Sequence, residues 1–572
     1  MRANDLGMEP KKIDVQLTHE AAGVLGSGTF HYGGDRWAHV SFSWSQTVPA
    51  ALAEGSKFDL VKAVTEDGQV FSLCACKVQG YSLYADYVIE ADLNSTSFDS
   101  ISVQYHDVSE WFLHWQNIDG EVGKTLTWKR VPEGIDVTVR TDGDHFGLRS
   151  EIIGSRRQQG EDVVLHERVE FVFTAEDNAF GLDDLKAKSH ELSCLLSILM
   201  MYPATIAAIK VSQDSEHYVR VHFPTSVRPE RDLQDSGFWL RCFIQQPWLE
   251  GEWQSIANRY YESRYRKVVW SRVAGMLRYE GFWEYKVFGY VSLLDSYLDI
   301  RFEGTKPTIQ LPPARKKIDR FRRNLATELP AVTQELREQV VEIASRSFAS
   351  IDDSFEDRFR KAAAEMDTDI AKIVNLSDED FKFIREIRNK IAHGDDHGLE
   401  ADEFPRVVRT EGKIALLLTY FAFLDLGVTP EKFVKCLSST HNSLRFAAML
   451  DDIHLSRVNR SAEFFPVTME KLEHFRTIKS LRVYGCCVQN ADGDLDYSQE
   501  FTKIYANWRS DLPRSLGLQT PERIFGLSQD DARMVGQGYF ECGEERVPVT
   551  HMWIIKHEAC SENQIGDRPD LA

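Results

Sequence analysis

The sequence predicts an α+β multidomain fold, with an antiparallel β domain at the N-terminus, an all-α helical bundle in the middle and a mixed C-terminal region. The chain has 572 residues, more than a single hydrophobic core usually supports. Apolar residues alternate with polar ones in the first part of the chain, which indicates strands. After Gly251 they recur every three or four residues, which indicates helices. We therefore predict domains over residues 1–240, 251–437 and 438–572.

Strand-like runs follow one another between Arg36 and Phe173, where β-branched and aromatic residues occupy every second position. Two further runs, 205–212 and 217–224, extend this pattern to about residue 240. Turn-forming Asp-Gly pairs separate several of the runs, at residues 67–68, 119–120 and 142–143. This arrangement predicts an antiparallel β domain, either a sandwich or a partly closed barrel.

One apolar segment, residues 192–209, approaches the length of a membrane span. Serines interrupt it and Pro203 stands where a helix would have to end, so we predict a buried helix followed by a strand, and no membrane partner. The nine cysteines are scattered and odd in number, which favours reduced thiols over a disulfide framework. The first residues lack the apolar stretch of a signal peptide. These features predict a cytoplasmic protein.

The formal net charge of −21 argues against a surface that binds nucleic acid as a whole, because phosphates need local positive potential. One basic segment is nevertheless a candidate for guiding RNA, and its cationic residues are Arg315, Lys316, Lys317, Arg320, Arg322 and Arg323. A second segment, 258–279, alternates basic with aromatic residues, a combination that also suits single-stranded RNA. Its residue types favour a helical segment whose aromatic side chains face the core and whose charges face water.

Helical spacing dominates the middle of the chain. Segments parted by proline, glycine or short polar loops predict helices over residues 252–268, 281–302, 332–351, 353–366, 378–393 and 411–428. After Ser438 the segment 461–482 is helix-like and the segment 546–557 is strand-like, which predicts the mixed C-terminal region.

The helix predicted over residues 378–393 has clear limits at both ends. Ser377 can accept a hydrogen bond from a backbone N–H of the first turn, and three acidic residues follow it. Gly394 suits the left-handed conformation that ends many helices. Apolar residues recur along the helix and predict the side that packs against its neighbours; they are Phe381, Ile384, Ile387 and Ile391.

Arg388 lies beside this apolar stripe, whereas Asn389 and His393, four residues apart, share a neighbouring face. A guanidinium can hold a scissile phosphate and the charge that develops on it. An imidazole can move a proton to or from the 2′-hydroxyl or the leaving oxygen, so the pair suits RNA cleavage without a metal. The same spacing of Arg and His recurs at residues 140–145 and 546–551, but only Arg388 and His393 lie in a capped amphipathic helix.

The segment RNKIAH, followed by glycine, resembles the signature of HEPN (higher eukaryotes and prokaryotes nucleotide-binding) domains. These domains are helical bundles in which an arginine, a polar residue, three further residues and a histidine mark the active ribonucleases. The segment FGYVSLLDSYLDIRF is similar to the first bundle helix of the ApeA-like group, and SEWFLHWQNIDG is similar to the β-rich domain that precedes that bundle. ApeA-like proteins are bacterial anti-phage proteins. The resemblance is good over residues 281–428, looser over the β domain, and absent after Ser438.

The resemblance implies that Arg388 and His393 are catalytic and that Asn389 supports them. It implies an HEPN-type, metal-independent endoribonuclease that cleaves single-stranded or loop RNA, with tRNA as one candidate, and leaves cyclic phosphate ends. It also implies a toxin of abortive infection and a homodimer in which the two motifs line one cleft. A phage-derived trigger is a further expected partner. No cofactor and no metal site are predicted.

Other interpretations stay open beside this one. The bundle could belong to a non-catalytic sensor or scaffold that only dimerises. The segment HGDDH, residues 393–397, could bind a metal, although Gly394 separates its two histidines. A zinc site could form from the late group Cys486, Cys487, Cys542, His551, His557 and Cys560, but the spacing lacks paired C-x-x-C motifs and favours buried thiols. The glycine-rich segment 23–35 lacks the lysine of a phosphate loop and predicts a β-turn connection.

Overall fold

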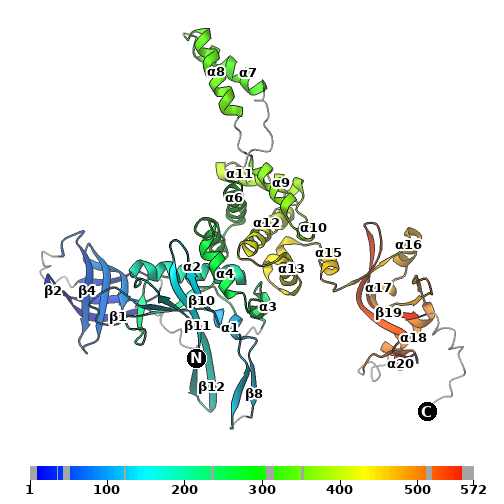
Figure 1. The fold of residues 1–572 in the computed structure, drawn as a ribbon, viewed down its shortest axis with the longest axis horizontal. Helices are drawn as coiled ribbons and strands as arrows, with labels where there is room; N and C mark the ends of the chain where they lie inside the picture. The colour runs from blue at the N-terminus through cyan, green and yellow to red at the C-terminus, as the bar shows by residue number, and fades with distance from the viewer. Residues whose placement is uncertain are drawn as a thin grey trace. The chain divides into compact units, whose positions relative to one another are not determined.

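The computed structural model describes residues 10–34, 36–42, 52–121, 124–232, 237–304, 315–330, 332–349, 353–510 and 518–556. Contacts within the chain define two compact units, Met1–Leu450 and Asp451–Ala572 (Figure 1). Each unit has a hydrophobic core of its own. The domains predicted over 1–240, 251–437 and 438–572 divide the chain at other positions and stay a prediction.

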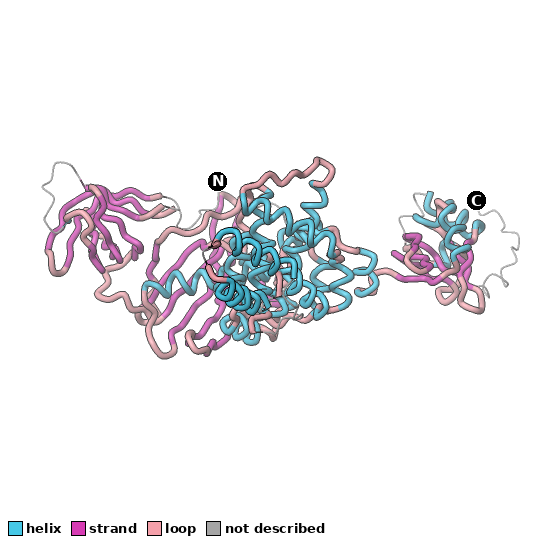
Figure 2. The backbone as a smooth tube through the Cα atoms, turned by 90° about the horizontal axis from the view of Figure 1, so that it is seen from above, coloured by secondary structure: helices cyan, strands magenta, loops and turns pink. Residues whose placement is uncertain are grey.

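The strands of the first unit form one antiparallel sheet and a separate hairpin, drawn in magenta in Figure 2. In the described residues, the strands of the sheet are β1 (Lys11–His19), β2 (Gly23–Tyr32), β3 (Ala38–Phe42), β4 (Lys57–Thr65), β5 (Val70–Gln79), β6 (Ser82–Ile89), β7 (Ser100–Tyr105), β10 (Asp136–Arg140), β11 (His145–Gln159), β12 (Asp162–Ala175), β13 (Ile206–Ser212) and β14 (Val219–His222). The hairpin consists of β8 (Asn117–Gly120) and β9 (Leu126–Arg130).

Six strands of the sheet close into a barrel, in the order β6-β3-β2-β1-β4-β5 and back to β6. Closure depends on β6, which pairs with β3 along one edge and with β5 along the other. Side chains at alternate positions fill the barrel, among them Leu17, Phe30, Val40, Phe71 and Leu83. The predicted antiparallel β domain is therefore confirmed. The expected sandwich or partly closed barrel is corrected, because the barrel closes completely and the sheet then continues beyond it.

The glycine-rich segment 23–35, predicted as a β-turn connection, instead forms strand β2 over Gly23–Tyr32. A Cβ on Gly28 would clash with the carbonyl oxygen of Ser41 on β3, so this glycine lets two strands approach closely. Gly26 has a φ of 133°, which other residues rarely adopt, at the point where the pairing with β1 shifts. The prediction was wrong because these glycines serve strand packing and a bulge rather than a turn.

From β6 the sheet continues through β14, β13, β7, β12 and β11 to its last strand, β10. Helix α4 (Trp253–Glu262) covers that edge. The Oε1 atom of Gln254 accepts a hydrogen bond from the Thr138 N–H at 3.0 Å, and its Nε2 donates to the Thr138 carbonyl oxygen at 2.8 Å. The side-chain amide thus takes the place of one residue of a further strand. Of the Asp-Gly pairs, 67–68 and 142–143 connect strands as predicted, whereas 119–120 ends strand β8.

The apolar segment 192–209 forms the end of helix α2 (Leu182–Met200) and the start of β13, as predicted. The helix ends at Met201, whose φ of 46° is left-handed, and Pro203 follows. The Tyr105 hydroxyl of β7 donates to the carbonyl oxygen of Ser189 at 2.6 Å and so joins the helix to the sheet. Within the described residues, no helix combines the length and the apolar character needed to cross a membrane.

Helices make up the rest of the first unit, drawn in cyan in Figure 2. Those described are α1 (Val108–Leu113), α3 (Phe238–Arg241), the π-helix Arg266–Trp270, α5 (Ser271–Met276), α6 (Trp283–Arg301), α7 (Arg315–Glu328), α8 (Gln334–Ala349), α9 (Phe355–Glu365), α10 (Thr368–Val374), α11 (Asp378–His393), α12 (Phe404–Asp425), α13 (Pro430–Ser439) and α14 (Ser443–Ala448), besides α2 and α4.

Helix α12 is the centre of the predicted bundle, and α6, α11 and α14 pack around it. Its side chains from Gly412 to Phe423 are buried. Phe359 of α9 stacks on Phe381 of α11 with ring centroids 3.8 Å apart, and Tyr297 of α6 stacks on Phe421 of α12 at 4.8 Å. The structure therefore confirms a helix-rich region after the β domain, while its assignment to the HEPN type stays a prediction.

The second unit is mixed, as predicted, and is built on a five-stranded sheet with the order β15-β18-β19-β16-β17. Its strands are β15 (Glu463–Pro466), β16 (Cys486–Gln489), β17 (Leu495–Tyr497), β18 (Ala532–Cys542) and β19 (Glu545–Lys556). Its described helices are α15 (Asp452–Val458), α16 (Met469–Thr477), α17 (Leu481–Tyr484), α18 (Gln499–Ser510) and α20 (Pro521–Ile524). Strand β15, which lies in the segment predicted as helix-like, pairs in parallel with β18.

Candidate active site

Helix α11 carries the predicted catalytic residues and has the predicted limits. The Ser377 hydroxyl accepts a hydrogen bond from the Asp380 N–H at 3.1 Å, which caps the first turn. Gly394 adopts a left-handed φ of 71°, and the next N–H, that of Asp395, donates to the Lys390 carbonyl oxygen at 2.9 Å. Of the predicted apolar stripe, Phe381, Ile384 and Ile387 are buried, whereas Ile391 in the last turn is half-buried.

Arg388 is held by three hydrogen bonds. Its Nε donates to the Ser292 hydroxyl on α6 at 3.2 Å, and its Nη2 donates to Asp295 Oδ2, also on α6, at 2.8 Å. Its Nη1 donates to the side-chain oxygen of Asn389 at 3.0 Å. A guanidinium has five N–H groups, so within the described residues two of them have no partner and can bind an anion. The side chain is 21% exposed, which leaves it accessible although it is anchored.

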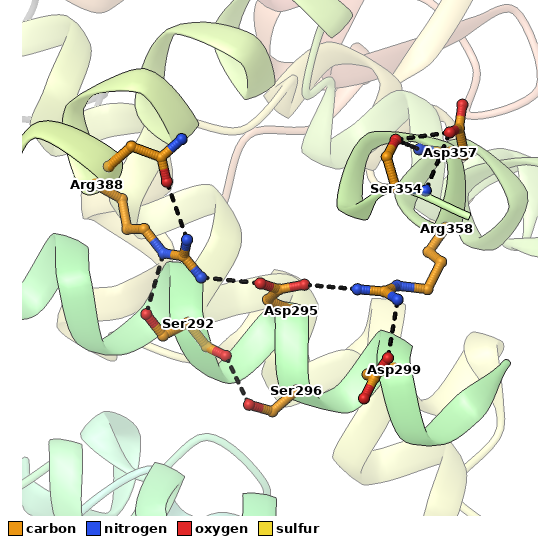
Figure 3. Close-up of polar contacts among 9 residues, drawn as sticks. Ser292, Asp295, Ser296, Asp299, Ser354, Asp357, Arg358 and Arg388 are labelled. Carbon is orange, nitrogen blue, oxygen red and sulfur yellow. Dashed lines mark hydrogen bonds and ion pairs between the residues drawn. The ribbon is translucent and has the colours of Figure 1, made fainter. Parts of the chain in front are cut away.

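Asp295 is shared between two arginines, as Figure 3 shows. One of its oxygens accepts from Arg388, and the other accepts from Arg358 Nη2 of α9 at 2.9 Å. Arg358 also donates from Nη1 to Asp299, one turn further along α6, at 2.8 Å. The carboxylate therefore links α6, α9 and α11, and it fixes the direction in which the Arg388 guanidinium points.

His393 is the last residue of α11, and its side chain is exposed. In the described part of the chain it has no hydrogen-bond partner. It lies about 7.5 Å from Arg388 along the helix axis and about 140° around it, because each residue adds about 1.5 Å and 100°. The structure thus brings Arg388 and Asn389 into contact and leaves His393 at the free end of the same helix, open to an incoming group.

Replacing Asp295 with alanine is expected to lower the free energy of unfolding by about 1–2 kcal/mol, because two partly buried guanidinium groups lose a shared acceptor. The matched control is Asp299→Ala on the same helix, which removes only the outer partner of Arg358. Asp299 is 70% exposed, so its loss is expected to cost less than about 0.5 kcal/mol. Urea unfolding of both variants measures the difference. Equal effects of the two substitutions would show that Asp295 is no more than a surface ion-pair partner.

Glu411 of α12 lies in the same bundle, close to Lys286 of α6. Burial raises the pKa of its carboxyl to about 7, although Lys286 opposes the rise. The carboxyl of an unfolded chain titrates near its ordinary pKa, so between about pH 4.5 and 7 the folded protein holds a proton that the unfolded chain has released. The protonated carboxyl of Glu411 therefore adds to the free energy of unfolding at low pH. This addition is lost as the pH rises from about 4.5 to 7.

For Glu411→Gln, we expect the free energy of unfolding to gain up to about 3 kcal/mol relative to the unsubstituted protein at about pH 8 and to change little at about pH 4.5. Urea unfolding at the two pH values gives both differences. A gain of the same size at both pH values would contradict a titrating Glu411.

The histidine beyond the cap, His397, does not join the site. Its carbonyl oxygen accepts from Lys390 Nζ at 3.0 Å, and its ring contacts Trp283 of α6 edge to face at 5.2 Å. Among the described residues, no group of three or more His, Cys, Asp or Glu side chains is placed to hold a metal ion. His397 therefore anchors the loop after α11.

Two of the late cysteines agree with the interpretation as buried thiols, whereas Cys542 is partly exposed. Cys486 and Cys487 are buried in β16, and burial raises the pKa of the Cys486 thiol to about 12. Both side chains therefore lie in the apolar interior, where burial favours the protonated thiol. His557 and Cys560 lie outside the residues that the structure describes.

The first copy of the Arg-His spacing lies at the hairpin of β10 and β11. Arg140 and His145 face each other across that hairpin, and each contacts its own carboxylate, Glu176 at 3.0 Å and Asp177 at 2.7 Å. The second copy, Arg546 to His551, lies within strand β19. Only the copy on α11 combines a helix end with a held guanidinium.

The predicted RNA-binding segment lies on helix α7, which packs against α8. Arg322 pairs with Glu338 of α8 at 3.1 Å and with Asp319 at 3.3 Å, and Arg323 donates to the Asp319 carbonyl oxygen. Arg320 is exposed, while the side chains of Arg315, Lys316 and Lys317 lie outside the described ones. Within the described residues, none of these side chains contacts the motif on α11.

The second basic and aromatic segment, 258–279, places aromatic rings in the core as its residue types favour, but not all of its charges face water. The rings of Tyr260, Tyr261 and Trp270 are buried in the core. Arg266 is buried as well, and its Nη2 donates to Asp144 at 2.9 Å. This segment therefore joins the helices to the sheet and does not present its rings to a ligand.

Sequence reasoning missed Ser292, Asp295 and Arg358, which hold the site together. One signal for them exists in the sequence: the apolar helix α6 carries polar residues at positions 292, 295, 296 and 299, spaced three and four apart. Such a polar stripe on a helix that is otherwise apolar predicts a polar contact with a neighbouring helix. It does not identify the arginines that make the contact.

The comparison with known families concerns the first part of the chain. Residues 28–260 match the family model of the ApeA N-terminal domain 1. The match begins within β2 and ends within α4, so it includes the rest of the large sheet and the barrel strands except β1. No curated protein and no solved structure gives a significant match. The predicted resemblance is thus confirmed for the N-terminal region, while α11 and its motif lie outside the match. Over residues 28–260, the chain is similar to the N-terminal domain 1 of ApeA.

Proposed function

We propose that this protein is an ApeA-like anti-phage defence protein whose helical bundle is a metal-independent HEPN endoribonuclease. The observation that carries the proposal is the placement of Arg388 and His393: the guanidinium is anchored by Asp295 and keeps two N–H groups available, and the imidazole is exposed at the end of the same helix. The match of residues 28–260 to the ApeA N-terminal domain 1 supports the role in defence.

In the proposed reaction, the imidazole of His393 takes the proton of an RNA 2′-hydroxyl. The 2′-oxygen then forms a bond to the adjacent phosphorus, and the bond between phosphorus and the 5′-oxygen breaks. The two available N–H groups of Arg388 bind the non-bridging oxygens, on which negative charge develops. The leaving 5′-oxygen takes up a proton from a protonated imidazole or from water, and the products carry a 2′,3′-cyclic phosphate and a 5′-hydroxyl. Asn389 supports Arg388 through the hydrogen bond to Nη1.

A homodimer suits this chemistry. Arg388 and His393 point to different sides of α11, so one helix does not readily place both over one phosphate, whereas two facing copies can supply an imidazole from each side. Exposed apolar side chains directly before α6, on α6 and on α12 support such pairing. They are Phe282, Tyr285, Phe288, Phe404 and Val408.

RNA is the proposed substrate, single-stranded or in loops, with tRNA as one candidate. The basic residues of α7 are candidates for guiding it, because Arg320 is exposed on a helix rich in cations. A phage-derived molecule is the expected trigger, and the expected outcome for the infected cell is abortive infection.

The proposal is tested by identifying the chemical groups at the ends of the cleaved RNA. Bacteria that express the protein or its Arg388→Ala/His393→Ala variant are infected with phage, and RNA ends are sequenced by a protocol that captures cyclic phosphates. Cyclic phosphate ends are expected to accumulate only with the unsubstituted protein, and its activity after purification is expected to persist in EDTA. If infected cells are protected equally by the variant, the bundle is a non-catalytic sensor or scaffold instead.

A further inference from the structure

A row of side chains crosses all six strands of the closed barrel on its outer surface. The strand pairings place these residues directly opposite one another, from β1 through β2, β3, β6 and β5 to β4. In that order they are Lys12, His31, His39, Tyr84, Lys77 and Lys57. The barrel interior is filled by the alternate positions, so this row, which we call the cationic row, faces outward.

The three rings at the centre of the cationic row form a stack. His31 and His39 lie with ring centroids 4.8 Å apart and ring planes 9° apart, and His39 and Tyr84 follow at 5.4 Å and 28°. All three are partly exposed. His39 Nδ1 contacts the Trp37 carbonyl oxygen at 3.2 Å. Within the described residues, the polar atoms of His31 and Tyr84 have no hydrogen-bond partner, so the stack keeps polar edges for a ligand.

The lysines of the row are exposed, and none of the three forms an ion pair with a described residue. Lys57 and Lys77 even lie directly opposite each other on neighbouring strands, an arrangement that destabilises a sheet. In a chain with a net charge of −21, uncompensated cations side by side favour a role in binding an anion. Burial, together with His39 and Lys12, lowers the pKa of His31, which agrees with a positive potential along the row.

A second row of polar side chains runs beside the first. The same strand pairings place Asp14, Thr29, Ser41, Ser82 and Gln79 next to one another. Thr29 donates to the only carboxylate of this row, Asp14, at 2.8 Å. Asp14, Thr29 and Ser41 also line a cavity of about 730 Å³ that opens to the surface. Hydroxyl, amide and carboxylate groups of this kind can bond the 2′-hydroxyl of ribose.

We propose that the outer surface of the barrel binds single-stranded RNA that follows the two rows around it, with phosphates along the cationic row and ribose groups along the neighbouring row of polar side chains. Because the row crosses all six strands of the closed barrel, it runs around it, and five steps between strands of about 4.8 Å each make a path of about 24 Å. This length suits a short stretch of a single strand, as in small barrels that bind about 4–16 nucleotides. The proposal does not rest on the nuclease proposed above, because binding by the barrel requires no cleavage.

The test uses the full chain with His393→Ala, so that RNA stays intact, and a fluorescently labelled single-stranded RNA of mixed sequence. Fluorescence anisotropy at several salt concentrations gives the affinity and its salt dependence. The test variant is Lys57→Ala/Lys77→Ala in this background. The matched control is Lys11→Ala/Lys62→Ala, which removes two lysines from the same barrel that are already paired, with Glu90 and Asp92.

The test variant is expected to bind RNA at least about tenfold more weakly, and the slope of log K against log salt is expected to become shallower by about 1.4, since each lost phosphate contact accounts for about 0.7. His39→Ala, which interrupts the stack, is expected to lose at least about fivefold. The control double variant is expected to stay within about twofold of the parent. Circular dichroism and thermal unfolding establish that all variants fold.

The proposal is overturned if the parent binds no RNA, or if the test and control variants lose affinity equally. The last measurement compares RNA with DNA of the same sequence. The parent is expected to bind RNA at least about fivefold more tightly than DNA. The variant Thr29→Val/Ser41→Ala is expected to bind both equally. Equal affinity of the parent for RNA and DNA would contradict the assignment of RNA. Loss of cleavage with binding intact, as expected for His393→Ala, bears only on the nuclease and leaves the barrel proposal supported.

Discussion

Replacing His393 with alanine is expected to slow RNA cleavage by a factor of about 10²–10⁴, the usual contribution of a general acid or base. The fold is expected to stay intact. His393 is exposed at the end of α11, and within the described residues no hydrogen bond depends on its side chain. Single-turnover cleavage of a labelled RNA by the purified variant measures the rate, and thermal unfolding measures stability.

His397→Ala is the matched control for this prediction. It removes the second histidine of the same segment, four residues later and beyond Gly394, where the ring contacts Trp283. Cleavage is expected to fall by less than about threefold, because this side chain transfers no proton in the proposed reaction. Comparable losses in both variants would contradict the assignment of His393 as the residue that moves the proton.

Replacing Arg388 with alanine is expected to slow cleavage by about 10²–10³, because charge on the phosphate loses its donors. The expected loss of stability is small, below about 1 kcal/mol, because Asp295 keeps Arg358 as its partner. Arg388→Lys is expected to recover only part of the activity. Lysine keeps the charge but lacks the planar fork that contacts Asp295 and a phosphate together.

Arg358→Ala is the matched control for Arg388, since both guanidinium groups bond the same carboxylate. It is expected to lower stability by about 1 kcal/mol and to reduce cleavage by less than about tenfold. Arg388→Ala is thus expected to lower mainly the cleavage rate, and Arg358→Ala mainly the stability. If Arg358→Ala abolished cleavage while Arg388→Ala retained it, the roles assigned to the two residues would be reversed.

The local features of the candidate site could be predicted from the sequence. Helix α11 begins after Ser377 and ends before Gly394 as expected, because capping depends on residues that are neighbours along the chain. The contact that holds Arg388 could not be predicted in the same way. Asp295 lies 93 residues away, and the packing of α6 against α11 decides which of its polar residues meets the guanidinium.

The β domain shows the same limit on a larger scale. Alternating residues predicted strands from Arg36 on and missed β1 and β2, and closure of the barrel depends on the pairing of β5 with β6 while β6 also pairs with β3. No single strand carries a signal for that closure. Strand β2 was missed because Gly26 and Gly28 suggest a turn by residue type, although they permit a bulge and a close approach between strands.

The hydrogen bonds between Gln254 and Thr138 have a consequence for solubility. A sheet with free edges can recruit strands from other molecules and so begin to aggregate. In this protein one half of the large sheet has no edge, because it closes on itself, and the last strand of the other half presents its backbone to a glutamine side chain. An amide group on a helix thus protects β10 from intermolecular pairing without the cost of another strand.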